Sequence, residues 1–121
     1  MNHSTRLLSC AALLCAATAA PAQDAAAGKA AFARCAGCHS VAANNGVGPG
    51  LQGVLGRKAG GVAGFHYSPA MQAAAKVWDA AALDAFIASP QQALPGNAMP
   101  FPGVPDAKVR ADIVAYLGML K

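Results

Sequence analysis

The chain has 121 residues, of which 55% are hydrophobic but only 6% aromatic, and its formal net charge is +4. This length leaves room for one domain, and so small a domain is often completed by a disulfide, a metal or a cofactor. The positive charge is too mild, and the basic residues are too scattered, for a nucleic-acid-binding protein.

The first 22 residues are typical of a secretory signal peptide. A short polar stretch with one positive charge at Arg6 precedes 14 uncharged residues, 7–20. Ala20-Pro21-Ala22 then supplies the small residues that a signal peptidase recognises, so we expect cleavage after Ala22, with Ala19 and Ala20 as alternatives. The apolar run is short for a transmembrane anchor. We therefore predict a cleaved signal peptide over residues 1–22 and a mature domain over 23–121, located in the periplasm without stable membrane insertion.

The mature chain begins with a predicted helix. Asp24 is a good N-cap, and Gly28 and Phe32 are spaced to share one face of a helix that extends to about Cys35. No later stretch has the alternation of a strand, and no internal repeat is present. The sequence therefore predicts an all-α domain.

The pentapeptide Cys-x-x-Cys-His ends this helix, at residues 35–39. It marks covalent attachment of haem c. Thiols at positions i and i+3, here Cys35 and Cys38, can reach the two vinyl groups on one edge of a porphyrin and form thioethers. The next residue, His39, is then carried under the ring, where its imidazole can bind the iron. We predict one haem c, attached through these cysteines.

Three other uses of the motif are less well supported. A thioredoxin-like dithiol requires the motif at the start of a helix that follows a strand, and no strand is predicted. A zinc site requires two further ligands, but beyond His39 only His66 is available in the mature chain. A structural disulfide would give His39 no role.

Two glycine- and proline-rich segments frame the middle of the chain. Residues 40–65 contain eight glycines and one proline, which predicts a loop of a length that is uncommon unless it surrounds a ligand. Ser68-Pro69 then predicts a short helix that ends near Lys76. Asp79 caps the next predicted helix, which ends at Ser89-Pro90.

A second loop, residues 91–104, leads to a final helix that is expected to begin at Pro105. Its apolar residues, at positions 113, 116, 117 and 120, form one stripe. The sequence thus predicts two terminal helices, two short middle helices and two loops. A flat apolar group between the loops would order both of them.

The second iron ligand is predicted to be Met99. It lies between prolines in a rigid, non-helical loop, where a methionine has nothing regular to pack against. Met71 and Met119 lie at helical spacings that suit core packing. His66 is the remaining alternative, because iron can also be bound by two imidazoles, although a lone histidine in a loop is more often exposed.

Taken together, these segments resemble class I cytochrome c, and the resemblance covers the mature chain from about residue 24 to residue 120. The segments that carry it, in family order, are Gly28-Lys29-Ala30-Ala31-Phe32, Cys35-Ala36-Gly37-Cys38-His39, Gly48-Pro49-Gly50-Leu51, Gly56-Arg57-Lys58-Ala59-Gly60, Gly64-Phe65-His66-Tyr67-Ser68, Val77-Trp78-Asp79, Pro95-Gly96-Asn97-Ala98-Met99 and Ala111-Asp112-Ile113-Val114-Ala115-Tyr116-Leu117.

The resemblance implies roles for several haem-binding residues. The carbonyl of Pro49 would accept a hydrogen bond from the free imidazole N–H of the iron-bound histidine. Tyr67 and Trp78 would donate to a haem propionate, with Arg57 close by, because a buried carboxylate needs such donors. Gly28 and Phe32 would pack on Tyr116 where the terminal helices cross.

The chain also departs from the family pattern. Phe86 stands where the family usually has a tyrosine, so a hydroxyl near the Met99 sulfur is missing. Gln91, Gln92 and Ala98 occupy positions that are often basic, which weakens the case for docking through a strong positive ring.

We therefore expect a monomeric single-electron carrier that works with redox partner proteins and is not an enzyme. One alternative is a permanent haem subunit of a larger dehydrogenase or oxidase. The other is a peroxidase or gas-binding haem protein, which would need an open iron site that Met99 would close.

Overall fold

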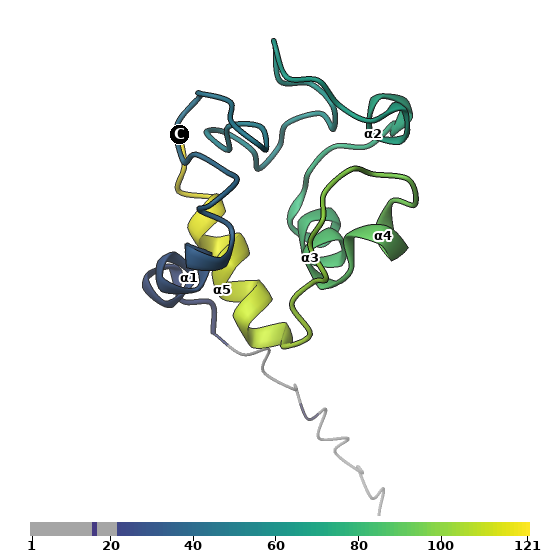
Figure 1. The fold of residues 1–121 in the computed structure, drawn as a ribbon. Helices are drawn as coiled ribbons and strands as arrows, with labels where there is room; N and C mark the ends of the chain where they lie inside the picture. Colours follow the sequence, from purple (N-terminus) through teal and green to yellow (C-terminus); the bar gives the residue numbers. More distant parts are fainter. Residues whose placement is uncertain (1–15, 17–21) are drawn as a thin grey trace, which may run out of the picture.

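The computed structural model describes residue 16 and residues 22–121, which fold as helices joined by long loops (Figure 1). The predicted signal peptide lies almost entirely outside the described residues. The helices are α1 (Ala25–Ala31), α2 (Pro69–Ala73), α3 (Ala80–Ala88), α4 (Pro90–Ala93) and α5 (Ala107–Leu117), with a 3-10 turn, η1 (Phe32–Arg34), directly after α1. Among residues 22–121 the one extended pairing is an isolated bridge between Lys58 and Val77. The predicted all-α class is confirmed.

The terminal helices α1 and α5 cross and pack against each other (Figure 1). A Cβ atom added to Gly28 would lie only 1.9 Å from the backbone oxygen of Asp112, so only glycine permits this close approach. Phe32 packs edge-to-face on Tyr116 with ring centroids 5.4 Å apart, and Ile113 is only 1% exposed. The packing that the family resemblance implies is present.

Asp112 joins the start of the described domain to α5. Its buried carboxylate accepts a hydrogen bond from the backbone N–H of Asp24 at 2.9 Å and forms an ion pair with Lys108 one turn earlier. The Lys108 hydrogen bond holds the pKa of this carboxyl below its ordinary value, against the opposing effect of burial.

Side-chain oxygens cap the N-terminal ends of four helices. Asp24, Ser68 and Asp79 each accept a hydrogen bond from a backbone N–H two or three residues later, as the sequence predicts. Asp106 does the same for α5 by accepting from Val109. The predicted start of this helix at Pro105 is therefore slightly wrong, because the carboxylate of Asp106 takes the cap position.

The middle of the chain differs more from expectation. The helix that begins at Pro69 ends at Ala73 instead of near Lys76, because the next residues pair with the first loop: the N–H of Ala59 donates to the carbonyl of Lys76 at 2.9 Å. Residues 91–93, expected as loop, belong to the one-turn helix α4, which has Pro90 at its first position. The first helix also changes to the tighter η1 turn before Cys35.

In Figure 1, α1 and α5 lie on one side of the molecule and α3 and α4 on the other, with the 40–65 loop and α2 above them. Leu83 and Phe86 of α3 and Ile113 and Leu117 of α5 are buried. These side chains also face a cavity between the two sides. The fold thus places the cavity between helices from both ends of the chain. No helix in the described part of the chain combines the length and the apolar character needed to span a membrane.

Candidate functional site

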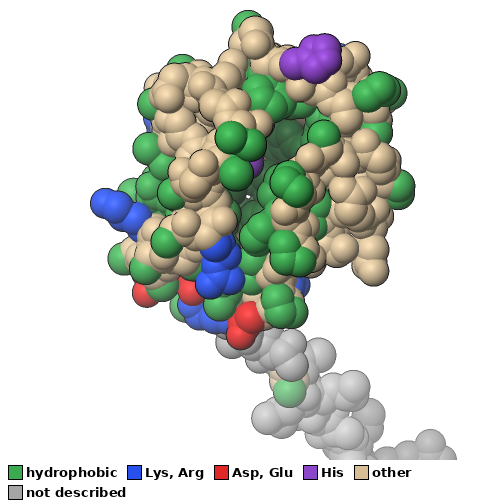
Figure 2. Space-filling model, in the orientation of Figure 1, with side chains coloured by type: hydrophobic (Ala, Val, Ile, Leu, Met, Phe, Trp, Pro, Cys, Tyr) green, Lys and Arg blue, Asp and Glu red, His purple; other side chains and the backbone are tan. Residues whose placement is uncertain are grey.

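The cavity has a volume of about 540 Å³, a size typical of cofactor sites, which span roughly 300–1,000 Å³. Its walls are mainly apolar and come from η1, α2, α3, α5 and both loops; they include Phe32, Leu51, Val54, Leu83, Ile87 and Phe101. Figure 2 shows a hollow on one face whose rim carries mainly hydrophobic and uncharged side chains, while charged side chains gather below it. The site is therefore a largely apolar slot with one open edge.

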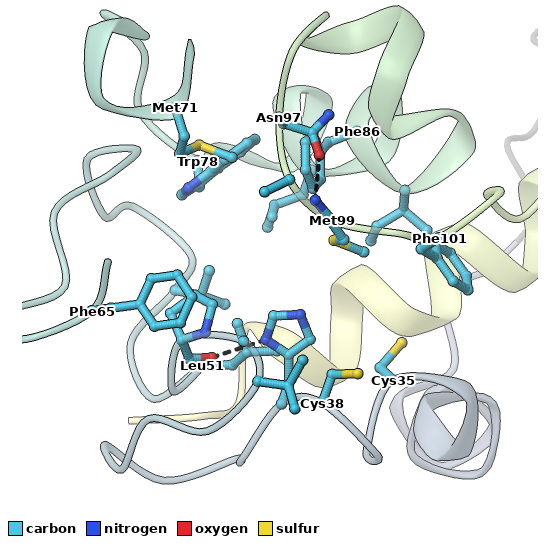
Figure 3. Close-up of a pocket in the computed structure, with 18 of the residues that line it drawn as sticks. Cys35, Cys38, Leu51, Phe65, Met71, Trp78, Phe86, Asn97, Met99 and Phe101 are labelled. Carbon is cyan, nitrogen blue, oxygen red and sulfur yellow. Dashed lines mark hydrogen bonds between the residues drawn. The ribbon is translucent and has the colours of Figure 1, made fainter. Parts of the chain in front are cut away.

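The sequence-predicted residues all line this cavity: Cys35, Cys38, His39, Pro49, Arg57, Tyr67, Trp78 and Met99. Figure 3 shows Cys35 and Cys38 on one side of the cavity and Met99 on the other. The structure thus brings together residues that are separated by up to 64 positions along the chain, as the numbers 35 and 99 give.

One helical turn brings the cysteines and the histidine together. The N–H groups of Cys38 and His39 both donate to the carbonyl of Cys35, at 3.1 and 3.0 Å. This turn carries the two thiols to the cavity, and the two sulfurs are not joined in a disulfide. Burial raises the pKa of the Cys35 thiol, although Arg34 opposes this shift. A reactive dithiol needs the opposite shift, so the thioredoxin-like alternative finds no support here.

The imidazole of His39 is held by the loop that faces it. Its Nδ1 lies 2.9 Å from the carbonyl oxygen of Pro49. A carbonyl can only accept, so Nδ1 carries the proton and Nε2 keeps a free lone pair. A Cβ atom added to Gly48 would lie 2.5 Å from the imidazole, so glycine lets the loop lie flat on the ring. These contacts fix both the tautomer and the orientation of the ring.

Met99 is held by Asn97, a residue whose function the sequence analysis missed. The side-chain oxygen of Asn97 accepts a hydrogen bond from the backbone N–H of Met99 at 2.9 Å, drawn as a dashed line in Figure 3. An asparagine two residues before a loop methionine is typical of an Asx-turn, and this was the signal available in the sequence. The loop is therefore ordered by its own hydrogen bonds.

Polar groups gather in another part of the cavity wall. Arg57 donates from one terminal nitrogen to the carbonyls of Gly50 and Gln52, while its Nε is buried without a hydrogen-bond partner among the described residues. The Tyr67 hydroxyl accepts from the N–H of Val62 at 3.2 Å, which leaves its own proton free to donate. An orphaned buried donor beside a free hydroxyl suits a carboxylate from a bound group.

Trp78 is buried at the cavity wall and packs on Phe86 with ring centroids 5.0 Å apart. The amine of Lys76 lies over the Trp78 ring, 5.9 Å from its centroid. In the described residues, Arg34 and Arg57 are the only lysine, arginine, aspartate or glutamate side chains that line the cavity. The formal charges that these side chains bring to the wall are therefore two, both positive.

The alternative iron ligands occupy different positions. His66 lines the cavity but is exposed, and Met71, in the middle of α2, packs against the buried core. Met119 lies beyond α5, is 66% exposed and does not line the cavity, so its prediction as core filler is wrong. Across the described residues, no cluster of three or more His, Cys, Asp or Glu side chains could hold a metal by itself. A zinc site is therefore unsupported.

The arrangement fits a haem c. One turn carries the two thiols and the His39 imidazole, whose Nε2 is free. The Met99 thioether lies across the apolar cavity, and the buried Arg57 Nε could donate to a carboxylate. A fold of this kind with this site defines a c-type cytochrome with one haem.

Comparison with known proteins agrees. The family model described as Cytochrome c matches residues 25–121, and the chain belongs to this family. Cytochrome c2 of Rhodoblastus acidophilus is 45% identical over 97 residues, which cover 78% of this chain and 91% of that protein. The cytochrome cy of Rhodobacter capsulatus is 43% identical over 80% of this chain, but the match spans only 49% of that longer protein. Among solved structures, cytochrome cH from Methylobacterium extorquens superposes with a TM-score of 0.76 at 48% identity, covering 78% of this chain and 97% of that one.

Membership of this family establishes the cofactor and the general role. The protein carries one haem c, bound covalently through its cysteine pair, and it is a single-electron carrier that works with redox partner proteins. The resemblance to class I cytochrome c is confirmed.

Proposed function

We propose that this cytochrome is an exported, monomeric electron carrier whose iron is bound by His39 and Met99, and that it is not an enzyme. The observation that carries the proposal is that hydrogen bonds position both proposed ligand residues. The His39 imidazole is fixed by the Pro49 carbonyl with Nε2 free, and Met99 lies across the cavity on a hydrogen-bonded loop.

When bound, the haem supplies an iron that changes by one electron between Fe(III) and Fe(II). The chain would keep the same two side chains at the iron in both states, because the His39 ring is bonded to the Pro49 carbonyl and the Met99 backbone is bonded to the Asn97 side chain. The thioether of Met99 and the apolar walls favour Fe(II), which raises the reduction potential. The walls also exclude water, so little rearrangement accompanies each electron.

Three residues fit the propionate end of a haem. The buried Nε of Arg57 and the free hydroxyl proton of Tyr67 would donate to a carboxylate, and the Trp78 indole N–H is a third donor at the same cavity. Such donors offset the cost of burying a charged carboxylate. Burial lowers the pKa of Arg57, while Tyr67 raises it, and a bound anion would add to the second effect.

Electrons would enter and leave where the site is open. Cys38 and Val47 line the cavity and are exposed, the latter at 74%. The edge of a haem attached to Cys38 would lie at this opening, within reach of a partner. If His39 and Met99 both bind the iron, no position would be left for a substrate, which supports a carrier over a peroxidase or gas-binding protein.

The predicted signal peptide supports export to the periplasm, and the mature chain carries no basic run that would favour nucleic acid. Gel filtration of native extract would distinguish a free monomer from a haem subunit of a larger complex. Elution with a dehydrogenase or oxidase would contradict the monomeric carrier.

Replacement of the proposed ligand tests the assignment. Met99→Ala should leave haem attached, because both cysteines remain, but should abolish the far-red absorption band of thioether-bound Fe(III) and let added imidazole bind readily. Met71→Ala is the matched control, since Met71 also lines the cavity, and it should keep the band. A band that survives Met99→Ala and disappears in Met71→Ala would show that Met71, and not Met99, binds the iron. His39→Ala should block maturation or leave unstable holoprotein.

A further inference from the structure

Asn97 is the most deeply buried polar side chain near the proposed iron ligand. It is 6% exposed, and it lies in the loop that follows α4, two residues before Met99. It also lines the cavity. Burial of an amide is unfavourable unless its hydrogen-bonding groups are satisfied.

The Asn97 side chain is satisfied entirely by backbone. Both protons of its amide nitrogen are used, one by the carbonyl of Pro90 at 2.9 Å and one by the carbonyl of Leu94 at 2.8 Å. Its oxygen accepts the N–H of Met99 at 2.9 Å. The amide therefore connects three backbone sites within ten residues of chain, 90–99.

These backbone sites belong to two different segments on the Met99 side of the cavity. Pro90 and Leu94 are the first residue of α4 and the residue directly after it, and α4 packs against α3. Met99 belongs to the irregular segment that follows. The side chain of Gln91 strengthens the same link by donating to the backbone carbonyl of Asn97 at 2.9 Å.

We propose that Asn97 is the positioning residue for Met99: its side-chain amide fixes the backbone of the methionine to α4 and so controls how readily the thioether leaves the iron. No other side chain bonds the N–H of Met99 in the described residues. The amide cannot serve a haem propionate at the same time, because both of its protons are already used. The proposal rests on Met99 as the iron ligand.

The test uses oxidised holoprotein and imidazole. At saturating imidazole the binding rate is limited by departure of Met99 from the iron. Asn97→Ala should raise this limiting rate about tenfold or more, since a factor of ten corresponds to about 1.4 kcal/mol, a typical value for one buried hydrogen bond. Asn97→Asp keeps the acceptor for Met99 but loses both donors to α4, so it should also accelerate exchange.

A matched control separates positioning from general loosening. Asn45 also joins backbone segments, by accepting from Gly50 and donating to Ala63, but in the loop on the His39 side. Asn45→Ala should leave the limiting rate within about twofold of the unsubstituted protein, as expected for a site on the His39 side of the cavity. Equal acceleration by Asn45→Ala, or none in Asn97→Ala, would overturn the proposal. A rate for Asn97→Asp like that of the unsubstituted protein would show that the link to α4 is unnecessary, and would overturn it too.

Hydrogen exchange makes the outcome independent of iron ligation. The Met99 amide should exchange about tenfold faster in Asn97→Ala than in the unsubstituted protein, by the same hydrogen-bond argument. If the unsubstituted protein lacks the thioether band, Met99 is not the ligand and the proposed function fails at that point. Unchanged Met99 exchange would overturn the positioning role in either case. If Asn97→Ala does not mature, the limiting rate of Asn97→Asp decides the question: acceleration supports the proposal, and an unchanged rate overturns it.

Discussion

The terminal helices and the two cavity loops are held in place by different means. Where α1 crosses α5, protein packs on protein: Gly28 lies against the Asp112 backbone, and Phe32 lies against Tyr116. The 40–65 loop instead lays its inner side on a cavity, and residues 41–47 are all exposed. We therefore expect the α1–α5 crossing to be stabilised by its own packing, and the loops to depend more on the group that fills the cavity.

Removal of covalent attachment should have the largest effect on this contrast. In Cys35→Ala/Cys38→Ala the loops would have to be ordered without haem, at a cost of roughly 1–2 kcal/mol of backbone entropy per residue. We expect circular dichroism to show a largely unfolded protein, with any residual helix at the α1–α5 crossing. A cooperative, native-like thermal transition in this double variant would contradict the comparison.

Gly28→Val tests the α1–α5 crossing. The added side chain meets the Asp112 carbonyl, which belongs to the backbone and cannot move aside easily, so we expect a loss of about 1–3 kcal/mol or more in the free energy of unfolding of the holoprotein. Gly46→Ala is the loop control, because its nearest contact would be 3.7 Å away. Denaturant titration measures both. Similar losses in the two variants would mean that the loops are as tightly packed as the crossing.

Asp112→Asn should produce a smaller change that depends on pH. The pKa of Asp112 is lowered in the folded state, chiefly by Lys108, so its contribution to stability is present above the unfolded pKa of about 3.9 and is lost as the pH falls through the lower folded value. The variant should be less stable at neutral pH and should respond less steeply to acid. Denaturant titrations across this range would show it.

The far-red band of oxidised Asp112→Asn should remain, because the carboxylate belongs to the helix crossing. Asp84→Asn, which breaks a more exposed ion pair with Arg110, should cost less stability at neutral pH. If it costs more, the Asp112 network contributes less to the crossing than its burial indicates.

Salt should have the smallest effect. Steering of a partner scales with the charge that faces it, and the uncharged Gln91, Gln92 and Ala98 occupy positions that are often basic in the family. Turnover with the redox partner should therefore fall by less than about twofold between low and moderate ionic strength. A steep decline would mean that Lys29, Arg34 or Lys108 forms a basic patch beside the opening.

Local signals in the sequence predicted much of the fold. The caps at Asp24, Ser68 and Asp79 act over two or three residues, so their effect could be inferred without knowledge of the rest of the chain. The motif at residues 35–39 is equally local, because one turn sets the geometry of the two thiols and the imidazole.

The features that were missed depend on distant partners. The end of α2 is set by pairing of the Lys76 carbonyl with Ala59, 17 positions earlier by their numbers. The short helix α4 and the role of Asn97 depend on each other. The Asn97 amide donates to the carbonyl of Pro90, where the helix begins, and to that of Leu94, directly after the helix ends. Judged from residue propensities alone, the prolines and glycines of residues 91–104 predict a loop without helix.

The absence of lysine from the cavity wall bears on ligand exchange under alkaline conditions. The resemblance to class I cytochrome c implies that a lysine of the methionine loop can replace the thioether at high pH, yet residues 91–101 contain none. The amine of Lys76 lies over Trp78, and that of Lys108 is paired with Asp112. Among the described residues no lysine lines the cavity, so Met99, as the proposed ligand, should remain bound to Fe(III) to higher pH than in lysine-bearing relatives. Loss of the far-red band at mildly alkaline pH, abolished by Lys76→Ala or Lys108→Ala, would refute this. Without such an internal competitor, we expect the ligand that finally displaces the methionine to be hydroxide from the solvent or a distant lysine.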